Sequence, residues 1–134
     1  MADGNFRVTK TDAEWKRILT PAQYNVLRQE GTEPPFSNPL LKEHRRGVFM
    51  CAACAWPVFS SNDKYESGTG WPSFVRPLNP QAVVTGIDRT LGMLRTKVSC
   101  ANCGGHLGHV FDDGPAPTYK RFCMNGTAMK FKPM

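Results

Sequence analysis

The sequence contains no long apolar run. Nowhere does it approach the roughly 18 consecutive apolar residues that a transmembrane helix needs. The first ten residues, MADGNFRVTK, also lack the apolar segment of a secretory signal. We therefore expect a cytoplasmic protein without a membrane partner. In that compartment thiols stay reduced, which favours metal binding or catalysis by cysteine over disulfide formation.

Internal repeats, low-complexity segments and a domain linker are missing as well. A chain of 134 residues is long enough for one core, so we predict a single domain over 1–134, with residues 1–10 flexible. The apolar fraction is 40%, and the chain contains 12 glycines and 11 prolines. This composition favours short elements joined by many loops over a bundle of long helices.

The sequence also lacks blocks of like charge. Its 17 Lys and Arg against 11 Asp and Glu give a formal net charge of +6, but only 44–46 (HRR) and 119–121 (YKR) form tight basic groups. Besides an enzyme, this chain could belong to two other classes of protein. The main alternative is a zinc ribbon that binds nucleic acid, and a thiol-based zinc redox sensor is another. Because the basic residues form no stripe, we expect no nucleic-acid partner.

Two capping boxes predict two N-terminal helices. TDAE at 11–14 and TPAQ at 20–23 each place Thr at the N-cap and Glu or Gln three residues later, so that both side chains satisfy free backbone N–H groups. The Pro of TPAQ suits the first turn of a helix. Gly31 is expected to end the second helix, and residues 37–44 are expected to add one further helical turn.

After residue 46 the pattern changes to short β-type runs. Gly, Pro, Asn and Asp separate the runs, as antiparallel connections require, and no run has the length for a βαβ crossover. We therefore expect a mainly β protein whose helices are confined to the first third. The predicted strands are the runs 48–50, 56–60, 74–78, 82–87, 91–98, 107–111 and 119–124.

Five cysteines are the most informative residues of the chain. Four form two C-x-x-C pairs, Cys51 with Cys54 and Cys100 with Cys103, and Cys123 stands alone. Each short pair lets two sulfurs converge on one ion, so the pairs predict a tetrahedral four-thiolate site for one Zn²⁺. Such a site has no open position for substrate, so the zinc is expected to be structural. Cys123 is then the only thiol left for chemistry.

Two histidines follow the second pair in the pattern Cys100-x-x-Cys103-x-x-His106-x-x-His109. This segment could supply a mixed cysteine and histidine site, and the two pairs could also be buried or redox-active thiols. Four cysteines in matched pairs make the simpler tetrahedron, which leaves both histidines free. Histidine is the usual general acid or base near neutral pH, so His106 and His109 are candidates for that role.

The segment around Cys123 predicts a strand with a polar face. Side chains alternate along a strand, so Arg121 and Asn125 are expected on the face of Cys123, with Phe122 and Met124 towards the core. An arginine beside a cysteine favours the thiolate, which is the nucleophilic form. A single cysteine on a strand is more often a small buried apolar residue, so this segment alone does not decide the role.

Trp71 follows a glycine-rich turn in SGTGWPSF, which suits either an indole at the rim of a pocket or an ordinary core residue. Together with other segments, SGTGWPSF gives the chain a resemblance to a known family. The chain resembles the methionine-(R)-sulfoxide reductases, the B type of methionine sulfoxide reductase. The other matching stretches are LTPAQYNVLRQEGTEPPFSNPL, both C-x-x-C pairs, GGHLGHVFDDGP and KRFCMNG. The resemblance covers nearly the whole chain. It implies two antiparallel sheets that form a small barrel-like β core, with the N-terminal helices packed outside and a structural zinc site opposite the active site.

The resemblance also implies how the site works. The thiolate attacks the electrophilic sulfur of methionine-R-sulfoxide, a neighbouring acid protonates the oxygen, and a sulfenic acid forms on the cysteine. His109 is the expected proton donor, and Trp71 is the expected wall for the S-methyl group. The implied catalytic residues are Cys123, His109, His106, Arg121 and Asn125, and the implied substrate-binding residues are Trp71 and Phe122.

One position departs from the family pattern. Many relatives resemble GCGWPSF, with a resolving cysteine where this chain has Thr69. If zinc takes four thiols, no resolving cysteine remains, so an external thiol must restore Cys123. The expected partners are oxidised proteins or free methionine-R-sulfoxide as substrate, and thioredoxin, glutaredoxin or a small thiol such as glutathione as reductant.

Overall fold

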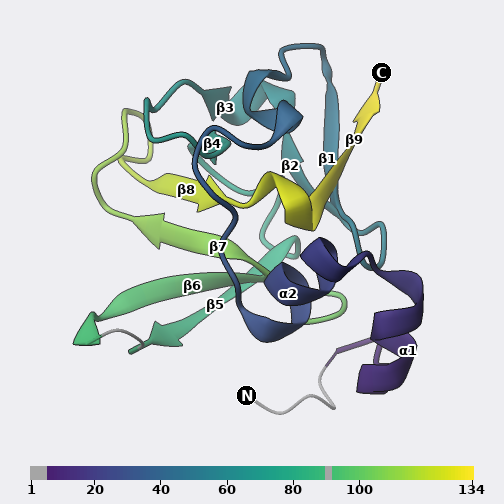
Figure 1. Cartoon of the computed structure of the whole chain (residues 1–134). Helices are drawn as coiled ribbons and strands as arrows, with labels where there is room; N and C mark the ends of the chain where they lie inside the picture. The colour runs from purple at the N-terminus through teal and green to yellow at the C-terminus, as the bar shows by residue number, and fades with distance from the viewer. Residues whose placement is uncertain (1–5, 90–91) are drawn as a thin grey trace.

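The computed structural model describes residues 6–89 and 92–134. Two helices come first, α1 (Asp12–Ile18) and α2 (Pro21–Gln29), and short strands follow (Figure 1). The strands are β1 (Gly47–Cys51), β2 (Pro57–Ser60), β3 (Lys64–Tyr65), β4 (Ser73–Phe74), β5 (Val83–Asp88), β6 (Arg95–Cys100), β7 (His106–Phe111), β8 (Arg121–Met124) and β9 (Met129–Pro133). Within the described residues, 3₁₀ turns include η2 (Pro39–Lys42) before β1, η3 (Ser61–Asp63) between β2 and β3, and η5 (Gly126–Ala128) between β8 and β9.

Both predicted capping boxes are present. Thr11 Oγ1 accepts a hydrogen bond from the Glu14 N–H (3.2 Å), and Glu14 Oε1 accepts one from the Thr11 N–H (2.8 Å). At the start of α2, Thr20 and Gln23 pair in the same way at 3.1 and 2.9 Å. The free N–H groups at both helix starts are therefore satisfied by the side chains that the sequence indicates.

The end of α2 differs from the prediction in one detail. The residue in the left-handed conformation is Glu30 (φ 57°), not Gly31. Gly31 is needed for space instead, because a Cβ there would lie 1.9 Å from the side-chain oxygen of Asn25. Further on, the helical turn predicted over 37–44 is limited to η2, which Asn38 caps.

Two antiparallel sheets form most of the fold. The smaller sheet has the strand order β2-β1-β9, and the larger has the order β3-β4-β8-β7-β6-β5. β9 pairs with β1 along its whole length, so the last strand of the chain completes the smaller sheet. α1 packs on α2, and α2 packs on β7 and η5, outside the sheets (Figure 1). The prediction of a mainly β fold with two antiparallel sheets and outer helices is confirmed.

Aromatic rings fill the space between the two sheets. Phe59 stacks on Phe74 with 4.4 Å between ring centroids, and Phe49 meets Phe74 edge-on at 5.1 Å. Phe122 lies 6.0 Å from Phe59. All four rings are buried, and the first two strands of the chain supply two of them. Each buried ring contributes about 2–3 kcal/mol, so these contacts hold the sheets face to face.

Some strand predictions need correction. The run 74–78 contains only the end of β4, because the Val75 N–H leaves the ladder and donates to the Asp63 carbonyl (2.9 Å). β3 and β9 are absent from the predicted set. β3 has only two residues, too few for a period-two pattern, whereas β9 alternates Met129 and Phe131 with lysines, a signal that the prediction did not use. Leu91, at the start of the run 91–98, lies outside the described residues, and β6 begins further along.

Residues 6–8 lie against the loop of the second cysteine pair. Residues 1–5 of the segment expected to be flexible lie outside the described residues. In the rest of that segment, the Val8 N–H donates to the Asn102 carbonyl (3.0 Å), and the Arg7 guanidinium lies 5.9 Å from the Trp56 ring centroid. Neither described α-helix combines the length and apolar character needed to cross a bilayer.

Candidate active site

Four sulfurs converge where β1 and β6 end. Cys51, Cys54, Cys100 and Cys103, named the cysteine cluster, have Sγ atoms within 4.8 Å of one another. Cys51 Sγ and Cys103 Sγ are 3.7 Å apart, and Cys54 Sγ and Cys100 Sγ are 3.6 Å apart. Thiolates at about 2.3 Å from a tetrahedral Zn²⁺ lie about 3.8 Å apart, so this spacing fits the ion.

The surroundings of the cysteine cluster also fit a bound cation. The backbone N–H groups of Asn102 and Gly105 donate to the sulfurs of Cys100 and Cys103, both at 3.4 Å. Hydrogen bonds among the sulfurs, and then burial, raise the pKa of Cys51. Four negative sulfurs in one buried site repel each other, and a divalent cation removes that cost. The donor set is therefore typical of a zinc site.

Cys123 lies on β8, inside the six-stranded sheet. Ser73 on β4 and His109 on β7 are its direct partners across the ladder. Residues opposite one another in antiparallel strands point to the same face, so a thiol, a hydroxyl and an imidazole share that face. β8 also shows the predicted alternation, with Phe122 and Met124 buried on the other side.

A cavity of ≈ 270 Å³ opens beside Cys123, and we name it the Cys123 cavity. Gly108 on β7 forms part of its wall, and no larger residue fits there because a Cβ would lie 2.1 Å from the Cys123 carbonyl oxygen. Thr69, Arg95 and Phe111 also line it. Five predicted site residues meet in this cavity: Trp71, His109, Arg121, Cys123 and Asn125.

The Cys123 thiol is half-buried and experiences opposing influences. Burial, the largest of them, raises the pKa of Cys123. The positive charge of Arg121 and a hydrogen bond from the Thr69 side chain lower that pKa. The thiolate is the nucleophilic form of a cysteine, and the cation and the hydroxyl both favour the thiolate form of Cys123 against the effect of burial.

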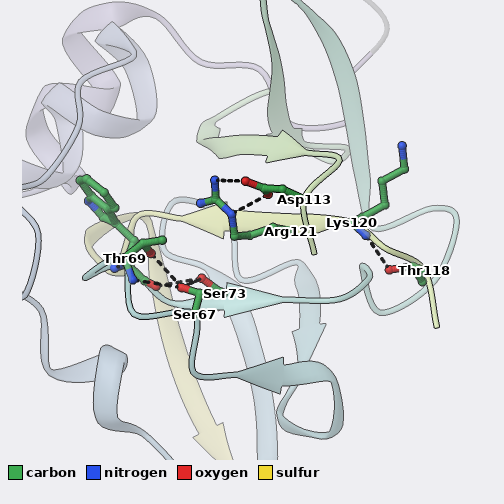
Figure 2. Close-up of polar contacts among 8 residues, drawn as sticks. Ser67, Thr69, Ser73, Asp113, Thr118, Lys120 and Arg121 are labelled. Atoms are coloured by element: carbon green, nitrogen blue, oxygen red, sulfur yellow. Dashed lines mark hydrogen bonds and ion pairs between the residues drawn. The ribbon is translucent and has the colours of Figure 1, made fainter. Parts of the chain in front are cut away.

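Two residues outside the predicted set fix Arg121. Its Nε and Nη2 donate to the two carboxylate oxygens of Asp113 at 2.9 and 3.1 Å, a bidentate pair that Figure 2 shows. Its guanidinium also lies over the Phe111 ring, 4.4 Å from the centroid. Hydrogen bonding to Asp113 raises the pKa of Arg121, so this side chain stays a cation beside Cys123.

His109 has a carboxylate partner that the sequence does not reveal. Its Nε2 lies 2.7 Å from Asp88 Oδ2. Asp88 is buried, and the same oxygen accepts a hydrogen bond from Arg95 Nη2 at 3.3 Å. A carboxylate on one ring nitrogen fixes the tautomer and the orientation of the ring. Nδ1 is therefore the nitrogen of His109 that a bound molecule can use.

His106 is not among the residues that line the Cys123 cavity. Its side chain is 2% exposed and packs edge-on against His109, with 5.2 Å between ring centroids. Burial lowers the pKa of His106 to about 4, so the ring is neutral near pH 7. Within the described residues neither ring nitrogen has a hydrogen-bond partner. The structure thus separates the two histidines: His109 faces the cavity and His106 supports its ring.

Asn125 and Trp71 are both tied to Glu33, in the connector that follows α2. Asn125 Nδ2 donates to the Leu107 carbonyl at 3.1 Å, and its Oδ1 accepts from the Glu33 N–H at 3.0 Å. The indole N–H of Trp71 donates to the Glu33 carbonyl at 2.9 Å. The buried Glu33 carboxylate accepts two backbone N–H groups of η5, at 3.0 and 2.7 Å. One residue therefore positions two walls of the Cys123 cavity.

Phe122 lies in the core instead of the cavity wall. It is 9% exposed, packs near Phe59 and is not among the residues that line the Cys123 cavity. The alternation that turns Cys123 towards the cavity turns Phe122 to the opposite face of the sheet. The expectation that Phe122 contacts substrate therefore does not agree with its position, whereas the expectation that it faces the core does.

A known protein family matches the part of the sequence that contains these cysteines and cavity residues. The family profile described as the SelR domain covers residues 19–133, which is most of the chain and includes every residue of the cysteine cluster and the Cys123 cavity. The chain belongs to the SelR domain family. The profile begins at residue 19, directly after α1.

Relatives of this SelR domain chain carry the name peptide methionine sulfoxide reductase MsrB. The one from Agrobacterium fabrum (strain C58) is 52% identical over 128 residues, which are 96% of this chain and 95% of the relative. The one from Leptospira interrogans is 51% identical over 96% of this chain and 98% of its own length. The one from Leifsonia xyli is 53% identical over 97% and 94%. This SelR domain chain is thus an oxidoreductase of the MsrB family.

Three acids that support the SelR domain site are missing from the sequence prediction. Asp113 lies in GGHLGHVFDDGP, and the β7–β8 register, with Phe111 opposite Arg121, is the signal that could have found it. Asp88 and Glu33 have no comparable signal, because each meets its partner across a long sequence separation. Only the folded chain brings these carboxylates to the cavity residues.

Proposed function

We propose that this SelR domain protein, acting as one domain, reduces methionine-R-sulfoxide in oxidised proteins and as the free amino acid. The observation that carries the proposal is the position of Cys123. Of the five cysteines it alone lies outside the cysteine cluster, and it lines a cavity with His109 and Arg121. The relatives named peptide methionine sulfoxide reductase support the class of substrate.

The proposed reaction moves one oxygen atom and two electrons. The Cys123 thiolate gives an electron pair to the sulfoxide sulfur while the sulfoxide oxygen takes up a proton. The oxygen then passes to Cys123 Sγ, the substrate leaves as methionine, and Cys123 becomes a sulfenic acid. The substrate sulfur is reduced by two electrons and the cysteine sulfur is oxidised by two, so the step is balanced.

The residues of the Cys123 cavity suit the two ends of a methyl sulfoxide. In its imidazolium form, in which both ring nitrogens carry a proton, His109 is held through Nε2 by Asp88 and can deliver the Nδ1 proton to the oxygen. Trp71 offers an aromatic wall for the S-methyl group, and its indole N–H is already used by Glu33. Asn125 is held on both sides of its amide, so it keeps a fixed polar edge towards the cavity.

The cysteine cluster is proposed to bind one structural Zn²⁺. The ion, when bound, would offset half of the negative charge of the four thiolates and join the loop after β1 to the loop after β6. Arg28 on α2 donates to the Cys103 carbonyl at 3.1 Å, so the helix rests on the same loop. Four sulfur ligands leave no coordination position for substrate, and the reaction at Cys123 therefore proceeds without the metal.

Recycling of Cys123 is proposed to use an external thiol. That thiol attacks the sulfenic sulfur, water leaves, and a mixed disulfide forms; a second thiol then releases Cys123 and a disulfide product. Thioredoxin, glutaredoxin and small thiols such as glutathione all supply such groups. The reason is the cysteine count: the four remaining cysteines form the cluster, and Thr69 has no sulfur to offer.

One turnover without reductant tests the proposal. Zinc-loaded protein is mixed with an equal amount of methionine-R-sulfoxide, dimedone is added, and the intact mass and peptide masses are measured. We expect one dimedone adduct on Cys123 and one equivalent of methionine. A disulfide between Cys123 and any cluster cysteine, or methionine formation without oxidation of Cys123, would overturn it. Methionine-S-sulfoxide is the matched control and should give no product.

A further inference from the structure

Three hydroxyl groups lie end to end beside Cys123. Ser67 Oγ is 2.8 Å from Thr69 Oγ1 and 2.7 Å from Ser73 Oγ, and Ser73 Oγ donates to the Trp71 carbonyl oxygen at 3.1 Å. Figure 2 shows these side chains gathered at one turn. We name Thr69, Ser67 and Ser73 the hydroxyl chain. At one end Ser73 is bonded to a backbone carbonyl, and at the other end Thr69 lines the Cys123 cavity.

The hydroxyl chain is anchored next to Cys123. Ser73 lies directly opposite Cys123 on the neighbouring strand and is 1% exposed. Thr69 and Cys123 line the same cavity, and the side chain of Thr69 lowers the pKa of Cys123 through a hydrogen bond. The N–H groups of Thr69 and Trp71 also donate to Ser67 Oγ (3.3 Å) and Thr69 Oγ1 (3.4 Å). The backbone of the turn therefore holds the hydroxyl oxygens in place.

The number of hydroxyl protons fixes the direction in which the hydrogen bonds of the hydroxyl chain run. Each hydroxyl has one proton to donate, and a carbonyl can only accept. With Ser73 donating to the Trp71 carbonyl, Ser67 must donate to Ser73. Thr69 then donates to Ser67 and presents a lone pair to Cys123. If Thr69 donates to Cys123 instead, all three hydroxyls turn round, and only the Trp71 carbonyl loses its partner.

We propose that the hydroxyl chain reverses its direction with the state of Cys123 and so positions the sulfur throughout the reaction cycle. Towards a thiol or a sulfenic acid, Thr69 accepts the proton of S–H or S–OH; towards a thiolate, Thr69 donates. The hydroxyls rotate and no proton passes between residues. The inference rests on the proposed function in one respect, namely that Cys123 is the sulfur that reacts.

The consequence concerns the oxidised state. Without a resolving cysteine the sulfenic acid must wait for an external thiol, and a hydrogen bond to Thr69 holds its oxygen on the side of the 67–73 turn. The sulfur then stays open towards the rest of the cavity. An interaction that serves the thiolate and the sulfenic acid in turn needs a group that can both donate and accept, and a hydroxyl is such a group.

Other groups around Cys123 have to be kept constant in a test. The charged or titratable side chains that face it are Arg121 on its own strand, His109 on β7, Arg95 on β6, Tyr65 on β3 and Glu33 in the connector after α2. Within the described residues no side-chain hydrogen bond joins these groups to the hydroxyl chain. A change at Thr69 therefore leaves all of them in place.

The test measures the rate of iodoacetamide alkylation of Cys123 in zinc-loaded protein between pH 6 and pH 10, with the site confirmed by mass spectrometry. In Thr69→Val, a variant of the same shape, the thiolate loses its donor. We expect alkylation about tenfold slower at a fixed pH below the pKa of Cys123. Ser67→Ala should slow it two- to threefold, because Thr69 keeps its proton but loses its support. Thr69→Ser should restore the original profile.

Thr118 supplies the matched control. Its hydroxyl donates to the Val75 carbonyl at 2.6 Å, outside the cavity, so Thr118→Val should leave the alkylation profile unchanged. The inference is overturned if Thr69→Val matches the original protein, or if Thr69→Ser behaves like Thr69→Val. Should Thr69→Val lose its zinc or its fold, an unchanged profile in Ser67→Ala overturns it. Alkylation needs no turnover, so failure of sulfoxide reduction would be recognised separately.

Discussion

In the cysteine cluster each sulfur has three other sulfurs within 4.8 Å, whereas Cys123 is surrounded by an arginine, a hydroxyl and an imidazole at the edge of a cavity. Both environments bury cysteine, and burial alone raises the pKa of a thiol. The cluster needs an external cation to hold its thiolates. Cys123 relies on a cation and a donor that belong to the protein. The first arrangement is closed, which suits the proposed metal site, and the second is open to a cavity, which suits the proposed reaction.

Removal of one cluster sulfur is expected to have the largest effect. Cys100→Ser leaves three thiolates, so zinc binding weakens and the two joined loops separate. Because structural zinc contributes roughly 10 kcal/mol to such sites, we expect loss of zinc and of most folded protein at 37 °C. Zinc analysis and circular dichroism check this. A Cys100→Ser protein that keeps its zinc and its melting temperature would contradict the structural role.

Removal of the Cys123 sulfur should affect turnover and leave the zinc and the fold unchanged. Cys123→Ser is expected to keep zinc and fold, and to lower turnover of methionine-R-sulfoxide with dithiothreitol at least about 10³-fold, since the nucleophile is gone. Product formation from a dabsylated substrate and a thermal melt measure both properties on one sample. Turnover that survives this substitution would refute the assignment of Cys123.

Asp88 orients the imidazole of His109, so its replacement tests how much that orientation contributes to activity. Asp88→Asn keeps the size of the side chain but removes the charge that holds Nε2. We expect kcat/KM to fall about 10- to 100-fold with the fold retained. Asp112→Asn is the matched control, because Asp112 pairs with Lys120 on the surface and should be replaceable without loss. Equal activity of the two variants would speak against a positioning role for Asp88.

A smaller effect concerns pH and stability. Burial lowers the pKa of His106 to about 4, below its value of about 6.5 in an unfolded chain. Between these values the unfolded state binds more protons, so stability falls as the pH falls through this range. We expect on the order of 1 kcal/mol less stability at pH 5 than at pH 6.5 from this residue. Urea melts of His106→Gln should lack this part, with zinc content measured at each pH.

Local patterns predict the parts of this fold that depend on neighbouring residues. The Thr11 and Thr20 capping boxes, the paired cysteines and the alternation around Cys123 all follow from spacings of two or three residues. The strand β4 is overestimated because Val75 continues an apolar run while its N–H already bonds elsewhere. That the whole chain forms one domain stays a prediction.

The supporting contacts of the site depend on distant parts of the chain and could not be predicted locally. Glu33 meets residues more than 90 positions away, and Asp88 on β5 meets His109 on β7 across the intervening strand β6. The assignment of Phe122 to the substrate site shows a different limit: the same alternation that turns Cys123 towards the cavity turns its neighbour into the core. A strand pattern therefore identifies which residues share a face, but not what lies opposite that face.

The buried Glu33 carboxylate also has a consequence for local unfolding. It accepts the Gly126 and Thr127 N–H groups, while its own backbone binds Asn125 and Trp71. In deuterated solvent, the amide protons of Gly126 and Thr127 and the indole proton of Trp71 should therefore exchange through one shared opening event. Glu33→Gln would accelerate all three together, which two-dimensional NMR can follow.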